Sequence, residues 1–508
     1  KYLRGKYAIC GIGETSYRRG SDQTTRSLAT WAIKNAMDDA GMTAGDVDGM
    51  LSYSGNDSTF STFVAGDLGI RLNFYMDVHG GGSSSECLIG IAIGEMPVIA
   101  LLNIPLRIYG SINGSLIYPT VPMLLFMGMA LEKSGIARDL LLALQHLLGR
   151  VPAGMAIAVT LLGILLAPTA GVIGASVATL ALIALPTMLE QGYRPSLASG
   201  VVAAAGTLGL ILPPAIMLFF LAGRLRVTIG HMFLAALWPA AILIVLYLLY
   251  YVIAAWRSPP KHPDSSAVDH WSFGWSPWQW LLFYVRGLVL PAGLIFLVLG
   301  SIIFAWATPP QSGAVGAAGG LLLMLLNGRL TWPLFREVIE GAALMTAMVF
   351  FVVLAANVFS YPFRFFSGDE VVSQMLGSLA FGDWGMLFTI IGIIFILGFF
   401  IDWIEITIIT LPLFMPVLRD LDFSAHLGPD GSGALWMATL IALTLQTSFL
   451  TPPFGFALFF LKGAAPPEVK IGDIYRGIIP IVGAQLLVIS LVIAFPLLAN
   501  WLPNQVFN

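Results

Sequence analysis

Charged side chains are scarce in this sequence of 508 residues: Asp, Glu, Lys and Arg make up 10% of it, and apolar residues make up 57%. Soluble domains average roughly 25% charged and 45–50% apolar residues. The scarcity excludes an ordinary soluble protein and predicts an all-α polytopic membrane protein for most of the chain. The net charge is −3 and no basic tract occurs, so the sequence does not indicate binding of nucleic acid.

The few charges are unevenly distributed. Nineteen of the 53 charged residues fall within residues 1–95, which leaves 34 for the rest of the chain. We therefore expect a short segment of soluble character, followed by a membrane body that begins near residue 96. The first residues also lack the charged and then apolar pattern of a secretory signal peptide.

Cysteine is scarce as well. Only Cys10 and Cys87 occur, both in the first segment, so a disulfide framework is not expected. In the membrane body, His146, His231 and His426 are isolated in the sequence and show no metal-ligand spacing. We expect no resident metal, no organic cofactor and no catalytic residues.

The segment 1–95 shows an α/β pattern. Gly11-Ile12-Gly13 is only a weak indication of a dinucleotide site, because the third glycine at the required spacing is missing. The expected elements are a strand over 7–13, an amphipathic helix over 27–40, a strand over 47–53 and a glycine-rich turn over 79–86 that enters another helix.

This segment resembles the N-terminal part of thiolase-like proteins. In active thiolases a nucleophilic cysteine opens the helix after the glycine-rich turn, but here that place falls on Gly82 or Ser83, and Cys87 comes later. The later parts of a thiolase, with its histidine and second cysteine, are missing, so the resemblance implies a truncated, fused fragment without enzymatic activity. The likeness rests on Gly11-Ile12-Gly13-Glu14-Thr15, Asp46-Val47-Asp48-Gly49-Met50 and Asp77-Val78-His79-Gly80-Gly81-Gly82-Ser83-Ser84.

Two ranges of the membrane body, 151–189 and 384–418, each hold a pair of short apolar segments around a polar or Pro/Gly interruption. Each segment is shorter than the span of about 20 residues that crosses a bilayer, so each pair predicts a re-entrant helical hairpin. A longer apolar helix follows each hairpin, and two adjacent prolines interrupt it. These broken helices are expected over 196–223, with Pro213 and Pro214, and over 433–463, with Pro452 and Pro453.

The two halves of the membrane body repeat the same plan. Leu185-Pro186 matches Met415-Pro416 at an offset of 230, and the two proline pairs match at an offset of 239. Such an ordered series indicates an inverted repeat of a re-entrant hairpin plus a broken helix. The expected parts are an α/β segment (1–95), membrane repeat 1 (96–256), a linker (257–282), scaffold and arm helices (283–345) and membrane repeat 2 (346–508).

The membrane body resembles the large permease subunit of tripartite ATP-independent periplasmic (TRAP) transporters over about residues 97–502. The likeness rests on Gly206-Thr207-Leu208-Gly209 in the first half, and on Gly398 to Ile406 and Thr447 to Gly455 in the second. It implies an elevator-type transporter of the bacterial inner membrane, coupled to Na⁺. It also implies two partners, a periplasmic solute-binding protein and a small membrane subunit, and a substrate among small organic carboxylates such as C4-dicarboxylates or 2-oxo acids.

Hydroxyl-bearing and small residues cluster beside the two helix breaks. A broken helix leaves carbonyl groups unpaired, and hard cations such as Na⁺ take several oxygen ligands. Serine and threonine hydroxyls in a membrane helix can instead bond to their own backbone. The predicted Na⁺ ligands are Ser176, Gly206, Thr207 and Gly209 in the first half, and Thr447, Ser448 and Thr451 in the second.

The predicted substrate contacts lie at the two hairpin tips: Gly171 and Gly174 in the first, and Asp402 and Glu405 in the second. Acids inside an apolar run are costly and indicate a functional site. The same two acids also fit a capping box, in which Asp402 caps the second arm and Glu405 bonds back to the cap amide. Capping and direct contact with ion or substrate are compatible.

Three alternatives remain open on the sequence. The chain could be a stand-alone ion or carboxylate carrier of the wider ion-transporter group, which shares the paired-hairpin plan. It could be a non-functional fusion, because the first membrane helix usual in TRAP permeases has no counterpart here. It could also be a membrane-anchored, thiolase-like acyl-CoA protein, which the missing nucleophile argues against.

Overall fold

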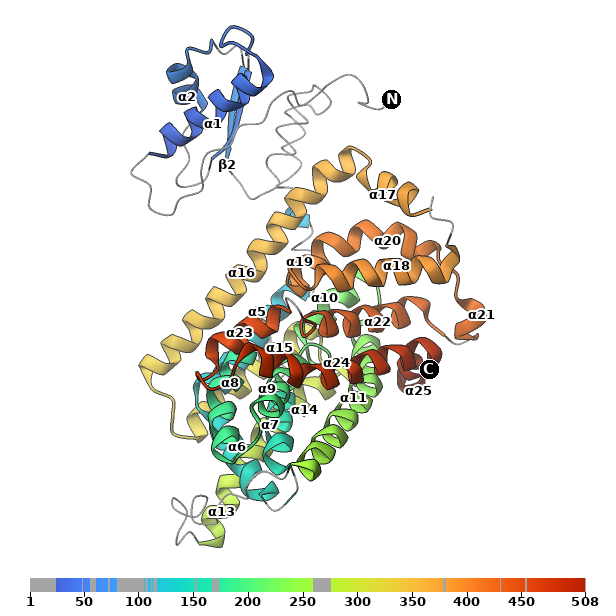
Figure 1. Ribbon diagram of the computed structural model, residues 1–508. Helices are drawn as coiled ribbons and strands as arrows, with labels where there is room; N and C mark the ends of the chain where they lie inside the picture. The colour runs from blue at the N-terminus through green and yellow to red at the C-terminus, as the bar shows by residue number, and fades with distance from the viewer. Residues whose placement is uncertain are drawn as a thin grey trace. The chain divides into compact units, whose positions relative to one another are not determined.

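The computed structural model describes residues 24–47, 49–54, 61–71, 74–79, 105, 108–110, 112, 117–149, 151, 153–166, 173–258, 276–377, 381–429, 431–452 and 455–507. The chain divides into two compact units (Figure 1). The first unit comprises Lys1–Ile112 and Val353–Val371, and the second comprises Asn113–Val352 and Val372–Asn508. Each unit is described by itself.

A pair of parallel strands with an intervening helix forms the described N-terminal part of the first unit (Figure 1). The strands pair from Gly49 opposite Phe74 to Ser54 opposite His79. A small core cluster gathers around Met50 from the first strand. The elements are α1 (Thr25–Ala40), β1 (Gly49–Ser54), α2 (Ser61–Leu68) and β2 (Phe74–His79).

The predicted helix over 27–40 and strand over 47–53 are confirmed as α1 and β1. Thr24 caps α1 by accepting the Ser27 N–H, and Gly41 ends the helix at φ 67°, a left-handed conformation that costs glycine nothing. Helix α2 and strand β2 were not predicted from the sequence. The predicted strand over 7–13 and the glycine-rich turn after β2 lie outside the described residues. The thiolase-like resemblance therefore stays a prediction.

An ion pair joins α1 to α2. The Nε and Nη2 atoms of Arg26 donate to the two Asp67 carboxylate oxygens, each at 2.6 Å, and this hydrogen bonding holds the pKa of the Asp67 carboxyl below its ordinary value. The folded state therefore has the lower pKa. The pair stabilises the unit above the ordinary Asp pKa of about 4, and this stabilisation is lost as the pH falls through the folded value.

Asp67→Asn is expected to speed amide hydrogen exchange in α2 at neutral pH, and to have no effect well below about pH 4, where the carboxyl of the unmodified chain is protonated too. The acceleration of exchange is expected to be small because the Arg26 and Asp67 side chains are both partly exposed. Exchange on the full-length protein, read by mass spectrometry, measures it. Asp38→Asn, at an exposed acid of α1, is the control, and an equal acceleration by both variants would contradict the prediction.

The second unit is helical throughout its described residues. Two of its helices, α16 and α17, continue into the first unit. The elements are α5 (Ile117–Lys133), α6 (Ile136–Leu148), α7 (Gly154–Leu165), α8 (Ile173–Glu190), α9 (Pro195–Leu208), α10 (Ile216–Leu225), α11 (Ile229–Arg257), α13 (Pro277–Tyr284), η3 (Val285–Val289), α14 (Leu290–Ile303), α15 (Pro309–Leu326), α16 (Trp332–Phe365), α17 (Gly368–Gly377), α18 (Gly382–Leu397), α19 (Trp403–Glu405), η4 (Ile406–Thr410), α20 (Leu411–Asp420), α21 (Ser424–Leu427), α22 (Gly433–Ser448), α23 (Phe456–Ala464), α24 (Ile471–Ala494) and α25 (Leu497–Phe507).

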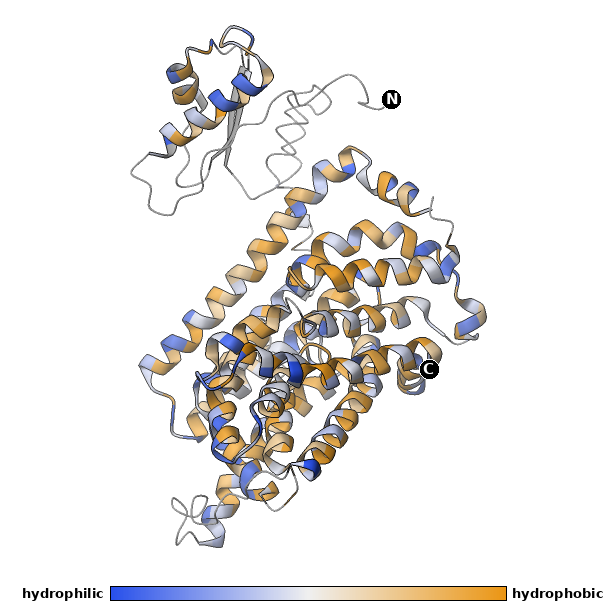
Figure 2. Cartoon of the chain, viewed as in Figure 1, coloured by the Kyte–Doolittle hydropathy of each residue, from blue (hydrophilic) through white to orange (hydrophobic). Residues whose placement is uncertain are grey.

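Several of these helices have the length and composition of membrane spans. Within the described residues, α11, the continuous run Pro277–Ile303, α16 and α24 are long and apolar enough to cross a bilayer. Apolar residues dominate along them in Figure 2. The chain is thus an all-α membrane protein over its second unit, as the sequence predicts.

Both predicted hairpins are confirmed as pairs of helices. In the first, α7 and α8 pack against each other, and in the second, α18 and the run α19–η4–α20 flank a turn at 398–402. Both predicted helix breaks are confirmed as well. They separate α9 from α10 at 209–215, and α22 from α23 at 449–455.

The two halves exchange partners. The α8 arm of the first hairpin packs against α23 of the second broken helix, and the η4–α20 arm of the second hairpin packs against α10 of the first. Likewise α24 packs against α9, and α11 packs against α22. Figure 1 shows the red α23 and α24 beside the green α8 and α9. This reciprocal exchange is what two repeats related by a two-fold axis produce.

Glycine permits the closest of these approaches. A Cβ on Gly174 of α8 would lie 2.6 Å from the Phe460 ring of α23, and a Cβ on Gly477 of α24 would overlap the Ser196 carbonyl oxygen of α9. Small residues at such crossings let helix backbones approach in a bilayer, where packing drives association.

Candidate functional site

Each half of the second unit brings part of a hairpin against the end of a broken helix, the α8 arm in the first half and the turn at Gly398 in the second. In the first half, a Cβ on Gly206, near the end of α9, would lie 2.6 Å from the Val177 Cγ2 atom of α8. Ser176 precedes Val177 and is buried, and Thr207 follows Gly206 and is fully buried. The structure therefore brings Ser176, Gly206 and Thr207 together, with Gly209 at the start of the break.

The second half repeats this contact. A Cβ on Gly398, at the start of the second hairpin turn, would lie 2.7 Å from the Ser448 Cβ at the end of α22 and would overlap its hydroxyl oxygen. Thr447 and Ser448 are fully buried, and Thr451 lies in the break. The hairpin turn and the three predicted hydroxyl ligands therefore gather in one place.

The hydroxyl groups bond to their own helix backbone. Thr447 Oγ1 donates to Leu443 O, Ser448 Oγ to Leu445 O and Thr451 Oγ1 to Thr447 O, each at 2.8 Å. In the first half, Thr207 Oγ1 donates to the carbonyls of Ala203 and Ala204 at 3.1 Å. A hydroxyl that donates its hydrogen keeps lone pairs on its oxygen. These bonds are therefore compatible with cation coordination and hold the lone pairs in fixed positions.

Asp402 begins the second arm of the second hairpin. The side chain is buried, at 8% exposure, and its Oδ1 accepts the Trp403 N–H at 2.9 Å. Asp402 is thus the helix cap that the sequence predicts. Glu405 does not complete the predicted capping box, and its Oε2 is buried without a hydrogen-bond partner within the part of the chain that the structure describes. The box fails because the Asp402 carboxylate bonds to the first amide of the helix and not to the third.

An aromatic contact holds this hairpin tip on the other repeat, and the sequence analysis missed it. Trp403 is fully buried, with its ring 5.7 Å from that of Phe220 on α10. Phe220 in turn lies 5.9 Å from Tyr118 of α5. The only available signal was a tryptophan directly after a capping acid.

Gln446 is a second candidate that the sequence analysis missed. It is fully buried, directly before Thr447, and neither Oε1 nor Nε2 has a hydrogen-bond partner among the described residues. The buried Thr407 hydroxyl of η4 likewise has no hydrogen-bond partner among the described residues. Buried polar atoms normally find partners, so both side chains are candidates to meet an ion, a water or a substrate. An amide within the long apolar run of α22 was the available signal.

The other predicted residues are placed as follows. Pro213, Pro214 and Pro452 lie within the two helix breaks, and Gly174 lies in the first turn of α8, against α23. Gly171 and Pro453 lie outside the described residues.

Comparisons with known proteins identify the family of the chain. A family model described as "Tripartite ATP-independent periplasmic transporter, DctM component" matches residues 93–498. The chain is 25% identical to the C4-dicarboxylate TRAP transporter large permease protein DctM of Pseudomonas aeruginosa, over 76% of this chain and 85% of that protein. It is 24% identical to the ectoine/5-hydroxyectoine TRAP transporter large permease protein UehC of Ruegeria pomeroyi, over 76% and 86%.

Two further proteins share part of the sequence or the fold. The isethionate TRAP transporter permease protein DctMQ of Oleidesulfovibrio alaskensis is 23% identical, over 80% of this chain and 60% of that protein. Among solved structures, the crystal structure of the Alcanivorax borkumensis YdaH transporter superposes with a TM-score of 0.54 and 15% identity, over 80% of this chain and 91% of the other. At that identity the likeness concerns the fold alone.

Proposed function

The chain belongs to the DctM component family of tripartite ATP-independent periplasmic transporters, and we propose that it is a Na⁺-coupled large permease subunit that takes up a small organic acid. The large permease role follows from the family. We propose in addition the coupling ion, the substrate class and the residues that bind them.

The observation that supports it best is the packing of a hairpin against the end of a broken helix in each half: the α8 arm against the end of α9, and the turn at Gly398 against the end of α22. At both places, helix-end carbonyl oxygens, each with a second lone pair, lie beside buried hydroxyl oxygens with fixed lone pairs, which together suit a hard monovalent cation. One Na⁺ site comprises Ser176, Gly206, Thr207 and Gly209. The other comprises Thr447, Ser448 and Thr451, with the Gln446 amide oxygen as a further ligand.

The proposed substrate lies between the two hairpin turns. The helix runs that start at Ile173 and Trp403 begin at these turns, and helix N-termini favour anions. Asp402 already accepts the first amide of the second run and would repel a carboxylate. We therefore place the acid group of the substrate nearer to the first turn, at Gly171 and Gly174, and assign Asp402 to capping.

The proposed partners are a small membrane subunit and a periplasmic solute-binding protein, and the proposed location is the bacterial inner membrane. Transport would move the hairpins and broken helices as one body past the scaffold helices, as in an elevator. The relatives named above carry the names of different solutes, so the substrate class proposed here rests on the site and not on one relative.

Reconstitution tests the proposal. The full-length protein, a candidate small subunit and a candidate binding protein from the same organism are combined with proteoliposomes, and uptake of a labelled panel of organic acids is measured with and without an inward Na⁺ gradient. We expect uptake that needs both the gradient and the binding protein. Equal uptake with a K⁺ gradient would refute Na⁺ coupling, and uptake without the binding protein would favour a stand-alone carrier.

Substitutions at Asp402 separate capping from a direct role of the charge. Asparagine caps about as well as aspartate, whereas alanine loses about 1 kcal/mol of cap stabilisation. We expect Asp402→Asn to keep most of the uptake and Asp402→Ala to lose most of it. Asp383→Ala, at an exposed acid on the other arm of the same hairpin, is the control and should behave like the unmodified chain. If Asp402→Asn is as inactive as Asp402→Ala, the carboxylate itself contacts the ion or the substrate.

A further inference from the structure

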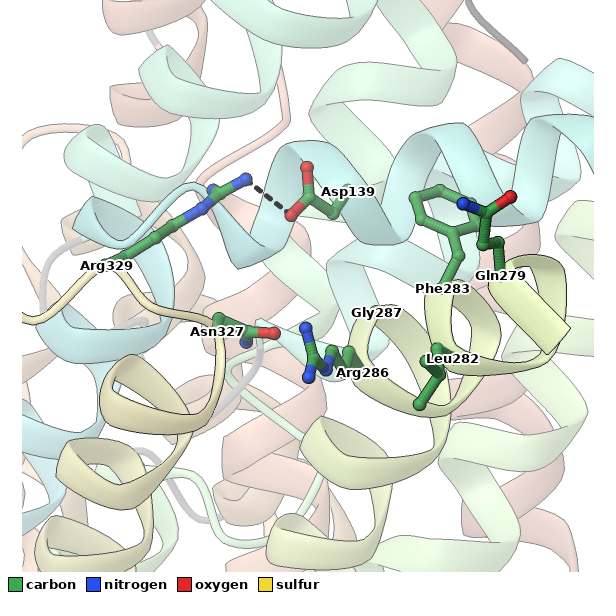
Figure 3. A pocket seen from close by; sticks show the side chains of 8 residues that line it. All are labelled: Asp139, Gln279, Leu282, Phe283, Arg286, Gly287, Asn327 and Arg329. Atoms are coloured by element: carbon green, nitrogen blue, oxygen red, sulfur yellow. Dashed lines mark hydrogen bonds and ion pairs between the residues drawn. The ribbon is translucent and has the colours of Figure 1, made fainter. Parts of the chain in front are cut away.

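A pocket of about 390 Å³ lies in the second unit, away from the hairpins and the helix breaks. It opens between α6, the run α13–η3 and the residues that follow α15 (Figure 3). Polar and basic side chains line one part of it and apolar side chains another. The lining residues are Asp139, Gln279, Leu282, Phe283, Arg286, Gly287, Asn327 and Arg329.

One of the two arginines is already paired. Arg329 Nη2 donates to the Asp139 carboxylate at 2.7 Å, and its Nη1 donates to the Ser134 carbonyl at 2.6 Å. A side chain at Gly135 would overlap that guanidinium. The α5–α6 turn therefore fixes Arg329 in place, and its charge is balanced by Asp139.

Arg286 is the other arginine, and its charge is not balanced. No ion pair or hydrogen bond of its guanidinium occurs among the residues that the structure describes, and the same holds for the Asn327 amide. Figure 3 shows the two side chains turned toward each other across the pocket. With Asp139 cancelling Arg329, the lining carries a net charge of about +1 from its formal charges.

Arg286 is an exposed charge in an otherwise apolar stretch of the chain. It lies within the apolar run Pro277–Ile303, which is long enough to cross a bilayer. Charged residues in such runs are retained where they pair with a partner or mark a binding site. Among the described lining residues, Asp139 is the one carboxylate near Arg286, and Arg329 already engages it. The Arg286 guanidinium is therefore available to bind an anion from outside the chain.

The surroundings suit the headgroup region of a membrane. Trp280 of α13 stacks on His146 of α6 at 4.2 Å, and Trp278 and Leu281 are exposed beside them. Tryptophan and tyrosine gather at the membrane–water interface. The exposed apolar face of α14, which continues the same run and includes Phe296, offers a surface for acyl chains.

We propose that this pocket binds a phosphate anion, and that the anion is the headgroup phosphate of an anionic phospholipid. The Arg286 guanidinium donates two parallel hydrogen bonds to the phosphate oxygens, and the Asn327 amide donates a third. Basic pockets between membrane helices are suited to such headgroups. The bound lipid stabilises the contact between α6 and the α13–α14 run.

Lipid binding to the purified full-length protein tests the site. The probes are phosphatidylglycerol, phosphatidylcholine of the same chain length, and inorganic phosphate, with bound ligand counted by native mass spectrometry. We expect phosphatidylglycerol to bind, and Arg286→Gln to weaken its binding roughly tenfold or more. Arg257→Gln removes the same charge from the exposed end of α11, outside the pocket, and should leave binding unchanged.

Two further variants keep the test decisive if Arg286→Gln folds poorly. Arg286→Lys keeps the charge but not the paired donors, so intermediate binding is expected. Asp139→Asn raises the net charge of the lining, so phosphatidylglycerol should bind more tightly. Inorganic phosphate that binds with the same dependence on Arg286 would support the site with a free anion as its occupant. Equal affinity for phosphatidylcholine, or phosphatidylglycerol binding that is indifferent to Arg286 and Asp139, would overturn the proposal.

Discussion

Replacing Gly477 with alanine is expected to lower the stability of the membrane body severely. A Cβ at this position would overlap the Ser196 carbonyl oxygen and would lie 3.1 Å from the Gly200 nitrogen. Both atoms belong to the backbone of α9, so relief requires a whole helix to move. Overpacking of this kind typically costs 1–3 kcal/mol, and backbone overlap places Gly477→Ala at about 3 kcal/mol or more.

The same helix supplies the control for this prediction. Gly483 also lies in α24, but a Cβ there would meet nothing within 4 Å. Gly483→Ala should therefore leave stability unchanged or raise it, because alanine favours a helix by up to about 1 kcal/mol over glycine. Thermal unfolding in detergent, followed by size-exclusion fluorescence, compares the two. Equal midpoints for both variants would show that α9 and α24 do not cross this closely.

Thr451→Ala is expected to abolish most Na⁺-driven uptake at low Na⁺, and to raise the Na⁺ concentration needed for half-maximal uptake by about tenfold. A hydrogen bond to a charged group contributes about 1.5–3 kcal/mol, and loss of one oxygen ligand to the cation is taken to be of the same order. The prediction rests on the proposed Na⁺ site. A Na⁺ titration of uptake in proteoliposomes measures it directly.

Thr444 is a matched control for Thr451. Its hydroxyl donates to the Leu440 carbonyl at 2.8 Å, the same bond to the preceding turn that Thr451 makes to Thr447. Thr444 lies within α22, away from the break. If Thr451 serves only its own backbone, the two alanine variants will affect the Na⁺ requirement alike, and the proposed site will be wrong. A shift confined to Thr451→Ala supports cation coordination at the break.

Much of the fold follows from local patterns. The hairpins were predictable because their apolar segments are too short to span a bilayer, and the breaks because adjacent prolines cannot continue a helix. The Asp402 cap was also predictable, because a cap depends on a few neighbouring residues. Glu405 shows the limit: its place in a capping box depended on side-chain geometry that spacing alone does not decide.

The residues that the sequence analysis missed depend on distant segments. Trp403 matters because α10 of the other repeat brings Phe220 to it, and Gln446 because packing buries it without a partner. Their local signals, a tryptophan after a capping acid and an amide in an apolar run, do not by themselves show these distant contacts. The Arg286 pocket is of the same kind, because its charge balance depends on Arg329 having already engaged Asp139.

The sequence by itself determined the membrane character, the two hairpins, the two breaks and the family of this protein, because composition, segment length and proline act along the chain. Only the tertiary structure decided which hairpin turn meets which helix end, which hydroxyls lie together and which polar atoms stay unpaired. Those outcomes depend on the exchange of partners between the two halves. In that exchange, residues far apart in the sequence compete for the same space and the same hydrogen bonds.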